Sequence, residues 1–383
     1  MASIEQFLKE KEEAGLLRTL KPITSRHQGS IYVKGREYID FSSNDYLGLS
    51  SHPKLIEANK QATDEFGTSS TASRLLSGDL DLHHQLEKEV AAFKHKEAAL
   101  VFNSGYQANV GILSALYGRD DCIFSDRLNH ASIIDGIALS GAKLFRFQHN
   151  DAGHLKSLLA EERGKFKNAL IISETIFSMD GDRCPLKDLV DLKNQYNCQF
   201  MVDEAHATGI FGKNGAGVVE EEGLEQEVDL VMGTFGKALG SFGAYLAASQ
   251  VVVDYLVNTC RSFVYSTALP PGVIAANRAG IEVVRDEPFR RQNLLECAEY
   301  FRDRLHQKGF MARGNSQIIP VVIGDNSKTV AYANKLLEKG YWVLPIRPPT
   351  VPQGQARLRF SLTFCHTKEV LDQLIDDISA ITI

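Results

Sequence analysis

The feature that most limits the fold is an alternation of short apolar runs with amphipathic stretches from about residue 53 onward. The runs are rich in β-prone residues, and the stretches between them, such as Ala108–Leu116 and Leu186–Tyr196, have helical periodicity. Strands joined by helical crossovers form a mostly parallel sheet with helices on both faces. The sequence therefore predicts an α/β domain with seven strands at Ala98–Phe102, Cys122–Ser125, Lys143–Phe147, Ala169–Ser173, Gln199–Val202, Asp229–Gly233 and Ala244–Ala248.

Further elements are predicted on both sides of this sheet. An amphipathic helix is expected over Ile4–Leu17, and a hairpin is expected where Ile31–Val33 and Tyr38–Phe41 flank Lys34-Gly35-Arg36. A long helical stretch begins at Pro271, and the region after it alternates helices and strands again. We therefore divide the chain into an N-terminal segment (1–46), a large domain (47–285) and a small C-terminal domain (286–383).

Composition excludes several classes of protein. The 383 residues carry 42 Lys and Arg against 48 Asp and Glu, a formal net charge of −6, which gives no basic field to attract nucleic acid. No apolar run has the length of roughly 18 residues that indicates a transmembrane helix. The six cysteines include no Cys-x-x-Cys pair, which argues against a metal site and favours a reducing compartment. We expect a cytoplasmic enzyme with no metal, no nucleic-acid partner and no membrane association.

Two polar motifs follow neighbouring predicted strands. Asp203-Glu204-Ala205-His206 comes after Phe200-Met201-Val202, and Thr234-Phe235-Gly236-Lys237 comes after Leu230-Val231-Met232. Ligands bind at the carboxyl ends of the strands in open α/β sheets. An aldehyde cofactor with a basic ring nitrogen needs an amine to form an imine and a carboxylate to keep that nitrogen protonated. Lys237 and Asp203 supply these groups, so the pair indicates pyridoxal 5′-phosphate.

A nucleic-acid-stimulated ATPase is the alternative interpretation of Asp203-Glu204-Ala205-His206. Such an enzyme also requires a Gly-x-x-x-x-Gly-Lys-Ser/Thr loop to bind the phosphates. The three Gly-Lys dipeptides, at 164–165, 212–213 and 236–237, are followed by Phe166, Asn214 and Ala238. None of these is Ser or Thr, which excludes the ATPase interpretation.

Three further segments place polar residues after predicted strands. Ser104, Gly105 and Tyr106 open a predicted helix, whose free amides and positive dipole end suit a phosphate. His130 follows the next strand and is placed to lie against an aromatic ring, and Ser178 follows the fourth. Each feature alone is more often structural than functional, but together with Lys237 they favour a cofactor site.

The order of these segments resembles the fold-type I pyridoxal phosphate enzymes, and specifically the α-oxoamine synthases. The resemblance covers the chain from about Arg18 to the C-terminus. It rests on the segments Ser42–Leu49, Ser178–Asp182, Thr234–Lys237 and Tyr265–Pro271. The segments Ile346–Pro352 and Ala356–Arg359 resemble the members that condense L-alanine with a pimeloyl thioester. One departure is the loop Gly67–Arg74, which has Ser, Thr and Ala over Thr68–Ala72 where many members have paired glycines.

The resemblance implies roles for individual residues. Lys237, His130, Asp203 and His206 would be catalytic, and the last three would contact the cofactor ring together with Ser178. The phosphate would lie near Ser104, Gly105, Tyr106 and Thr234, with Ser266 and Thr267 supplied by the neighbouring subunit of a homodimer. The expected substrate contacts are Arg18, Asn44, Thr350 and Arg359.

The family's reaction joins an amino acid to an acyl thioester with loss of CO2. The expected substrates here are L-alanine and either pimeloyl-CoA or a pimeloyl-acyl carrier protein, with a role in biotin biosynthesis. Two alternatives remain open at this point. In the first, the chain is another member of the family, which acts on glycine and an acetyl thioester or makes a long-chain amino-ketone signal. In the second, it is a non-catalytic subunit with the same fold.

Overall fold

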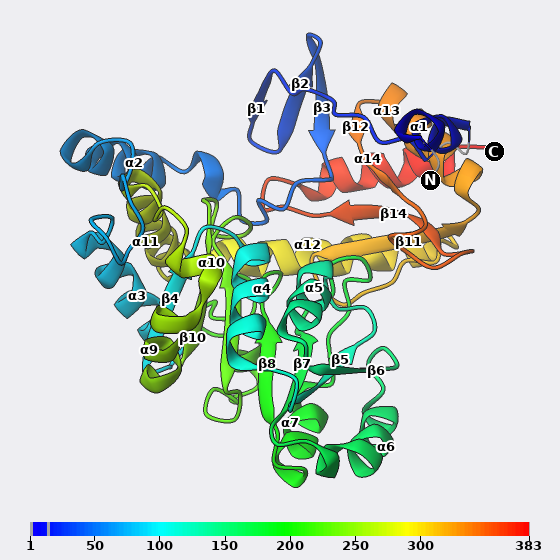
Figure 1. Cartoon of the computed structure of the whole chain (residues 1–383). Helices are drawn as coiled ribbons and strands as arrows, with labels where there is room; N and C mark the ends of the chain where they lie inside the picture. Colours follow the sequence, from blue (N-terminus) through cyan, green and yellow to red (C-terminus); the bar gives the residue numbers. More distant parts are fainter. Residues whose placement is uncertain (1–2, 14–15, 383) are drawn as a thin grey trace.

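The computed structural model describes residues 3–13 and 16–382 and confirms the predicted seven-stranded sheet (Figure 1). Its strand order is β4-β10-β9-β8-β7-β5-β6, and β10 runs antiparallel to both β4 and β9, whereas the other pairings are parallel. The strands are β4 (Ala98–Phe102), β5 (Cys122–Asp126), β6 (Lys143–Phe147), β7 (Ala169–Glu174), β8 (Gln199–Asp203), β9 (Leu230–Thr234) and β10 (Ala244–Ala248).

Helices cover both faces of this sheet, which explains why most of its strands are continuous apolar runs. Alternate strand residues belong to two separate cores; in β5, for example, Ile123 packs in one and Phe124 in the other. One face carries α4 (Gly105–Leu116), α5 (Ala131–Ser140), α9 (Gln250–Thr259) and α10 (Arg261–Val264). The other carries α2 (Pro53–Phe66), α3 (Asp81–Phe93), α6 (Ala152–Glu162), α7 (Leu186–Gln195), α8 (Val218–Glu221) and α11 (Pro271–Asp286).

The smaller C-terminal unit is built around a three-stranded antiparallel sheet of order β11-β14-β13. Its apolar side chains continue the core that includes α11 and α7. Its elements are α12 (Phe289–Gln307), β11 (Ile318–Gly324), α13 (Asn326–Glu338), β12 (Tyr341–Trp342), β13 (Pro345–Ile346), β14 (Ala356–Ser361) and α14 (Lys368–Ser379).

The N-terminal segment contributes α1 (Ile4–Glu13), β1 (Ser25–His27), β2 (Ser30–Val33) and β3 (Arg36–Asp40). Strand β3 pairs in parallel with β12, so this segment lies beside the C-terminal unit, at the same end of the molecule (Figure 1). The proposed division at residues 46 and 285 remains a prediction.

The strand predicted over Asp229–Gly233 is shifted by one residue in β9, to Leu230–Thr234, and two predictions for the N-terminal segment also need correction. Helix α1 ends at Glu13, whereas the predicted helix continued to Leu17; Ala14 and Gly15 lie outside the described residues, and Leu16 and Leu17 are not helical. None of the residues of α1 is buried, so packing does not extend this short helix.

The hairpin is one residue tighter than predicted, because Arg36 belongs to β3. Its loop consists of Lys34 and Gly35, with φ of 51° and 78°. Two consecutive positive φ angles are characteristic of the type I′ turn that closes two-residue hairpins.

Within the part of the chain that the structure describes, no helix combines the length and apolarity needed to cross a membrane. The parallel strands β5, β7, β8 and β9 end at Asp126, Glu174, Asp203 and Thr234. Polar residues are therefore gathered at one edge of the sheet, as ligand sites in such sheets require.

Candidate active site

Lys237 and His206 form the centre of the candidate site. Lys237 follows β9, and its Nζ lies 2.9 Å from Nε2 of His206, in the turn after β8. Burial lowers the pKa of Lys237 to about 8, although the negative charges of Asp203 and Glu174 oppose this decrease. A partly buried amine with a lowered pKa is a competent nucleophile near neutral pH.

Tyr46 fixes the imidazole of His206 from the opposite side. Burial, together with the positive charges of Lys237 and Arg359, lowers the pKa of His206 well below its usual value, so the ring is neutral. The Tyr46 hydroxyl lies 2.7 Å from Nδ1 of His206 and donates to Oδ1 of Asn44 at 3.0 Å. Nδ1 therefore donates to Tyr46, which leaves Nε2 as the acceptor for the amine of Lys237.

Asp203 ends β8 as a buried carboxylate with two hydrogen-bond donors. Its Oδ2 accepts from Nδ2 of Asn109 on α4 at 3.0 Å, and its Oδ1 accepts from the amide of Ala205 at 2.9 Å. Buried carboxylates without partners are costly, and these two bonds hold Asp203 in place. The carboxylate is thus held next to the strand that leads to Lys237, as the sequence predicts.

His130 lies at the end of the turn after β5 and caps α5. Its Nδ1 accepts from the amide of Ser132 at 3.2 Å, and its own amide donates to Oε1 of Glu174 at 2.6 Å. Burial lowers the pKa of the His130 ring, an effect that the charge of Asp203 opposes. Burial and the charge of Asp203 raise the pKa of Glu174 well above its usual value.

The start of α4 meets the end of β9 at the predicted phosphate site. Ser104 is the N-cap of α4, and its Oγ accepts from the amide of Gln107 at 3.2 Å. A Cβ atom at Gly105 would lie 2.9 Å from Cγ2 of Thr234, so glycine is needed for this close approach. Tyr106 is half exposed, and its hydroxyl donates to Asp135.

These residues fit pyridoxal phosphate. Oγ1 of Thr234 is buried without a hydrogen-bond partner among the described residues, beside the free amides at the start of α4. Amine and carboxylate stand on adjacent strands, as an aldehyde with a ring nitrogen requires. Within the described ranges no cluster of three or more His, Cys, Asp or Glu is arranged to hold a metal ion.

Arg359 reaches the site from β14 of the C-terminal unit. Its Nε donates to the carbonyl oxygen of Ser178 at 2.5 Å and its guanidinium donates to Oγ of Ser361 at 2.6 Å. Arg359 is buried, and its positive charge lowers the pKa values of Lys237 and His206. The contact with Ser178 uses the main chain of that residue.

Arg18 and Thr350 are brought together at a cavity whose lining does not include Lys237. A guanidinium nitrogen of Arg18 donates to Oγ1 of Thr350 at 3.3 Å. Both line a cavity of about 920 Å³ between the N-terminal segment and the C-terminal unit, with Phe7, Leu337 and Trp342 among its apolar walls.

Ser266 and Thr267 lie on the loop after α10. Oγ of Ser266 accepts from the side chain of Gln107 at 2.9 Å, and the carbonyl of Thr267 accepts from the Asn103 side chain at 2.9 Å. Their segment is therefore held beside the start of α4, and Thr267 is exposed.

Sequence reasoning assigned no role to four contributors: Tyr46, Asn109, Glu174 and Gln317. Asn109 is one helical turn after Gly105, and Glu174 ends a strand beside Asp203, so their positions could have indicated the site. Gln317, which donates to the carbonyl of His206 at 2.9 Å, gives no such indication because it lies 111 residues away in the sequence.

Comparisons with known proteins agree with this geometry. Residues 36–378 match the family described as aminotransferase class I and II. The chain is 48% identical over 377 residues to an 8-amino-7-oxononanoate synthase of Geobacter sulfurreducens, covering 97% of this chain and 96% of that protein.

Two solved structures have the same fold. Serine palmitoyltransferase of Sphingomonas wittichii is similar with a TM-score of 0.94 and 33% identity, over 99% of this chain and 97% of that one. An 8-amino-7-oxononanoate synthase of Francisella tularensis is similar with a TM-score of 0.78 and 32% identity, over 89% and 97%. The chain therefore belongs to the aminotransferase class I and II family of fold-type I pyridoxal phosphate enzymes and, within it, to the 8-amino-7-oxononanoate synthases.

Proposed function

We propose that this pyridoxal phosphate-dependent acyltransferase condenses L-alanine with a pimeloyl thioester, in the biotin pathway. The products are 8-amino-7-oxononanoate, CO2 and the free thiol of the carrier, which is coenzyme A or an acyl carrier protein. The observation that carries the proposal is the partly buried amine of Lys237, which contacts the neutral imidazole of His206 and whose pKa is influenced by the charge of Asp203.

We assign the cofactor contacts from the residues gathered around Lys237. Asp203 would hold the protonated ring nitrogen, His130 would lie on the ring face, and Ser178 and His206 would face the phenolic oxygen. The phosphate would be held by the start of α4, at Ser104, Gly105 and Tyr106, and by Thr234, whose hydroxyl is unpaired among the described residues. When bound, pyridoxal phosphate acts as an electron sink for the negative charge left on the substrate Cα.

The protein side chains would move the protons and orient the amino acid. Neutral Lys237 would remove the proton from Cα of alanine, and its pKa of about 8 suits that exchange near neutral pH. Arg359 carries a buried positive charge and would pair with the alanine carboxylate. Asn44 accepts a hydrogen bond from the same Tyr46 hydroxyl that contacts His206, and it would be a second substrate contact. Arg18 and Thr350 would approach the acyl chain and its thioester.

We also propose a homodimer with shared active sites. Leu76 and Tyr265 are 79% and 74% exposed, on segments that the bridge between Ser73 and Thr267 joins. Exposed apolar side chains on two joined segments support a subunit contact there. Ser266 and Thr267 would then reach the cofactor phosphate of the partner. A cytoplasmic location is consistent with six free cysteines, five of them buried.

Mass spectrometry of the products tests the substrate assignment. The purified enzyme receives L-alanine, glycine or L-serine with acetyl, pimeloyl or palmitoyl thioesters, on coenzyme A and on acyl carrier protein. We expect the mass of 8-amino-7-oxononanoate from alanine and the pimeloyl donor. Serine and palmitoyl donors belong in the panel because of the similarity to serine palmitoyltransferase. Preferred turnover of any other pair would refute the assignment.

Two variants test the role of Lys237. Lys237→Ala should lower turnover by roughly 10²–10⁴-fold, the range for loss of a general acid–base group, and borohydride should no longer fix the cofactor to the protein. Lys165→Ala is the matched control, because that lysine also follows a glycine but its side chain is 57% exposed and paired with Glu162. Equal losses in the two variants would contradict the role of Lys237.

A further inference from the structure

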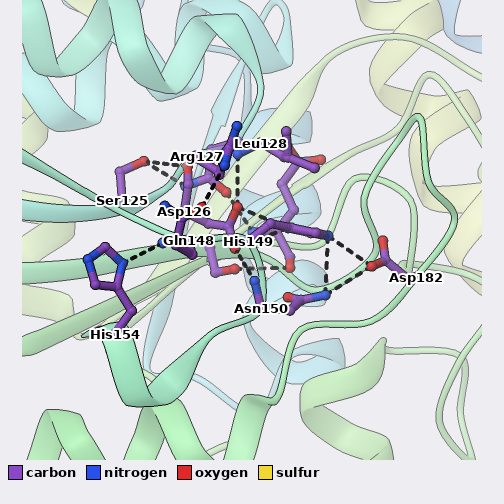
Figure 2. A network of polar contacts seen from close by, with 12 residues as sticks. Ser125, Asp126, Arg127, Leu128, Gln148, His149, Asn150, His154 and Asp182 are labelled. Carbon is purple, nitrogen blue, oxygen red and sulfur yellow. Dashed lines mark hydrogen bonds and ion pairs between the residues drawn. The ribbon is translucent and has the colours of Figure 1, made fainter. Parts of the chain in front are cut away.

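His149 lies in a polar network outside the residues assigned to the reaction (Figure 2). It follows β6 and stands between two carboxylates from other segments of the chain. Its Nδ1 is 3.0 Å from Oδ1 of Asp126, at the end of β5, and its Nε2 is 2.9 Å from Oδ2 of Asp182, in the loop after β7. Its ring also lies edge-on to Phe177, with the ring centroids 4.4 Å apart.

The two contacts define the protonation state of the ring. Each carboxylate accepts hydrogen bonds, so both ring nitrogens must donate, and only the imidazolium has two N–H groups. Burial by itself lowers the pKa of His149, but the hydrogen bonds and charges of Asp126 and Asp182 outweigh it and raise the pKa to about 10. His149 is therefore a fixed cation at neutral pH.

Asp126 connects His149 to the turn that carries His130. Its Oδ1 also accepts from the amide of Leu128 at 2.8 Å, which shapes that turn. The turn continues into Asn129, whose Oδ1 accepts from the amide of Glu174 at 3.2 Å. The carboxylate of Asp126 is fully buried, so its orientation depends on these donors.

Asp182 connects His149 to the loop that carries Ser178. The carbonyl of Asp182 accepts from the amide of Phe177 at 3.0 Å, which closes the loop on itself. On its far side the loop binds the C-terminal unit, where the Ser178 carbonyl accepts from Arg359 and the Asp180 carboxylate accepts from Arg357 at 2.6 Å. The loop is thus held between His149 and the two arginines.

The other charged groups on these segments point to different partners. Arg127 donates to Oε1 of Gln148 at 2.5 Å, and Arg183 pairs with Glu221 at 2.7 Å. His154, at the start of α6, accepts from the amide of Gln148 at 2.9 Å. Asn150 supports the same contact as His149, because its side chain donates to Oδ2 of Asp182 at 3.0 Å.

We propose that His149 is a positioning residue that holds Asp126 and Asp182 together. It thereby aligns the His130 turn and the Ser178 loop, and through that loop it aligns Arg359 for the amino-acid substrate. The proposal rests on the proposed function, in which Arg359 binds the carboxylate of alanine. Loss of His149 should therefore loosen the Ser178 loop and weaken the binding of alanine, while the groups that move protons stay in place.

The test compares three variants of the full-length enzyme loaded with pyridoxal phosphate. His149→Gln removes the double donation, and Asp182→Asn removes the negative charge on the loop side, at a residue whose side chain is 32% exposed. His154→Gln is the matched control, because it changes a nearby histidine that accepts from the amide of Gln148 and contacts neither Asp126 nor Asp182. Hydrogen–deuterium exchange of residues 176–184 is measured beside the kcat and KM for L-alanine.

We expect exchange of 176–184 to accelerate roughly tenfold in His149→Gln and in Asp182→Asn, with KM for alanine raised by about the same factor and kcat changed by less than about threefold. His154→Gln should match the wild type. If His149→Gln does not fold, Asp182→Asn decides the result. Unchanged exchange and KM in a folded variant would overturn the proposal, even if the melting temperature falls.

The exchange measurement separates this inference from the proposed function. If the wild-type enzyme fails to use L-alanine, the substrate assignment is wrong, but exchange of 176–184 still reports whether His149 holds the loop. If the wild type uses alanine and the loop exchanges equally in all variants, the role of His149 is wrong and the substrate assignment stands.

Discussion

The reactivity of Lys237 depends on opposing effects at one nitrogen atom. Burial lowers its pKa, while Asp203 and Glu174 raise it, and the result is a pKa of about 8. At pH 7 about one amine in ten is then neutral, against about one in 2,500 for a free lysine with a pKa near 10.4. Because the neutral amine is the nucleophile, this difference sets how readily the protein takes up its cofactor.

The pH dependence of cofactor attachment tests this value. The rate at which cofactor-free protein couples pyridoxal phosphate should rise about fivefold from pH 7 to 8 and less than about twofold from pH 8 to 9, because Lys237 is then mostly neutral. Stopped-flow absorbance measures it. In Asp203→Asn the loss of the negative charge should move the plateau to lower pH. A steady tenfold rise per pH unit up to pH 9 would contradict the lowered pKa.

Tyr46 allows a second test at the scale of one hydroxyl group. Tyr46→Phe removes the acceptor of the His206 Nδ1–H group and leaves that buried donor unpaired, at a cost of about 1–3 kcal/mol. We expect turnover to fall roughly tenfold while cofactor is retained.

Tyr300→Phe serves as the control for Tyr46→Phe, since it loses a hydroxyl bound to Asp372 at 2.7 Å in the C-terminal unit. Steady-state kinetics and cofactor content are measured for both variants. If the two lose turnover equally, the contact between Tyr46 and His206 has no special role.

At the scale of the element, the site depends on where a helix begins relative to a neighbouring strand. Gly105 opens α4 against Thr234, and Gly105→Ala would place a Cβ atom 2.9 Å from Cγ2 of Thr234. Overpacking of this kind costs about 1–3 kcal/mol, so we expect the Kd for pyridoxal phosphate to rise roughly 10- to 100-fold. Equilibrium dialysis measures the Kd.

Gly118→Ala is the control for Gly105→Ala, since a Cβ atom at Gly118, just after α4, meets nothing within 4 Å. It tests the effect of a methyl group near the other end of the same helix. Equal affinities in the two variants would show that the start of α4 does not hold the phosphate.

The same elements show how far sequence reasoning extends. The strands β4, β6 and β10 have the predicted bounds, because a sheet covered on both faces produces apolar runs that stand out in the sequence. The placement of Asp203 and Lys237 follows from two further strands of this sheet, β8, which ends at Asp203, and β9, which ends at Thr234. The contact between Tyr46 and His206 spans 160 residues, and the contact between Arg359 and Ser178 spans 181. Such contacts depend on loop paths that no periodicity encodes.

At the scale of the whole molecule, distant parts of the chain meet around the site. The N-terminal segment adds β3 to β12 of the C-terminal unit, and Arg359 crosses from that unit to the loop after β7. Meanwhile Ser266 and Thr267 lie beside the start of α4, and Thr267 is exposed. Because the resemblance to the α-oxoamine synthases implies that Ser266 and Thr267 reach the neighbouring subunit, we expect one site to draw Lys237 from one protomer and Ser266 and Thr267 from its partner.

Subunit mixing tests this expectation. Lys237→Ala and the double variant Ser266→Ala, Thr267→Val should each have little activity as homodimers. When they are unfolded together and refolded at equal amounts, half of the dimers are mixed, and each mixed dimer has one site with all native residues. About a quarter of the wild-type activity should therefore return, as expected for a two-fold dimer with shared sites. Recovery should be absent when the Lys237→Ala protein is refolded with Lys237→Ala, Ser266→Ala, Thr267→Val. If mixing restores no activity although light scattering shows dimers, each site is complete within one protomer.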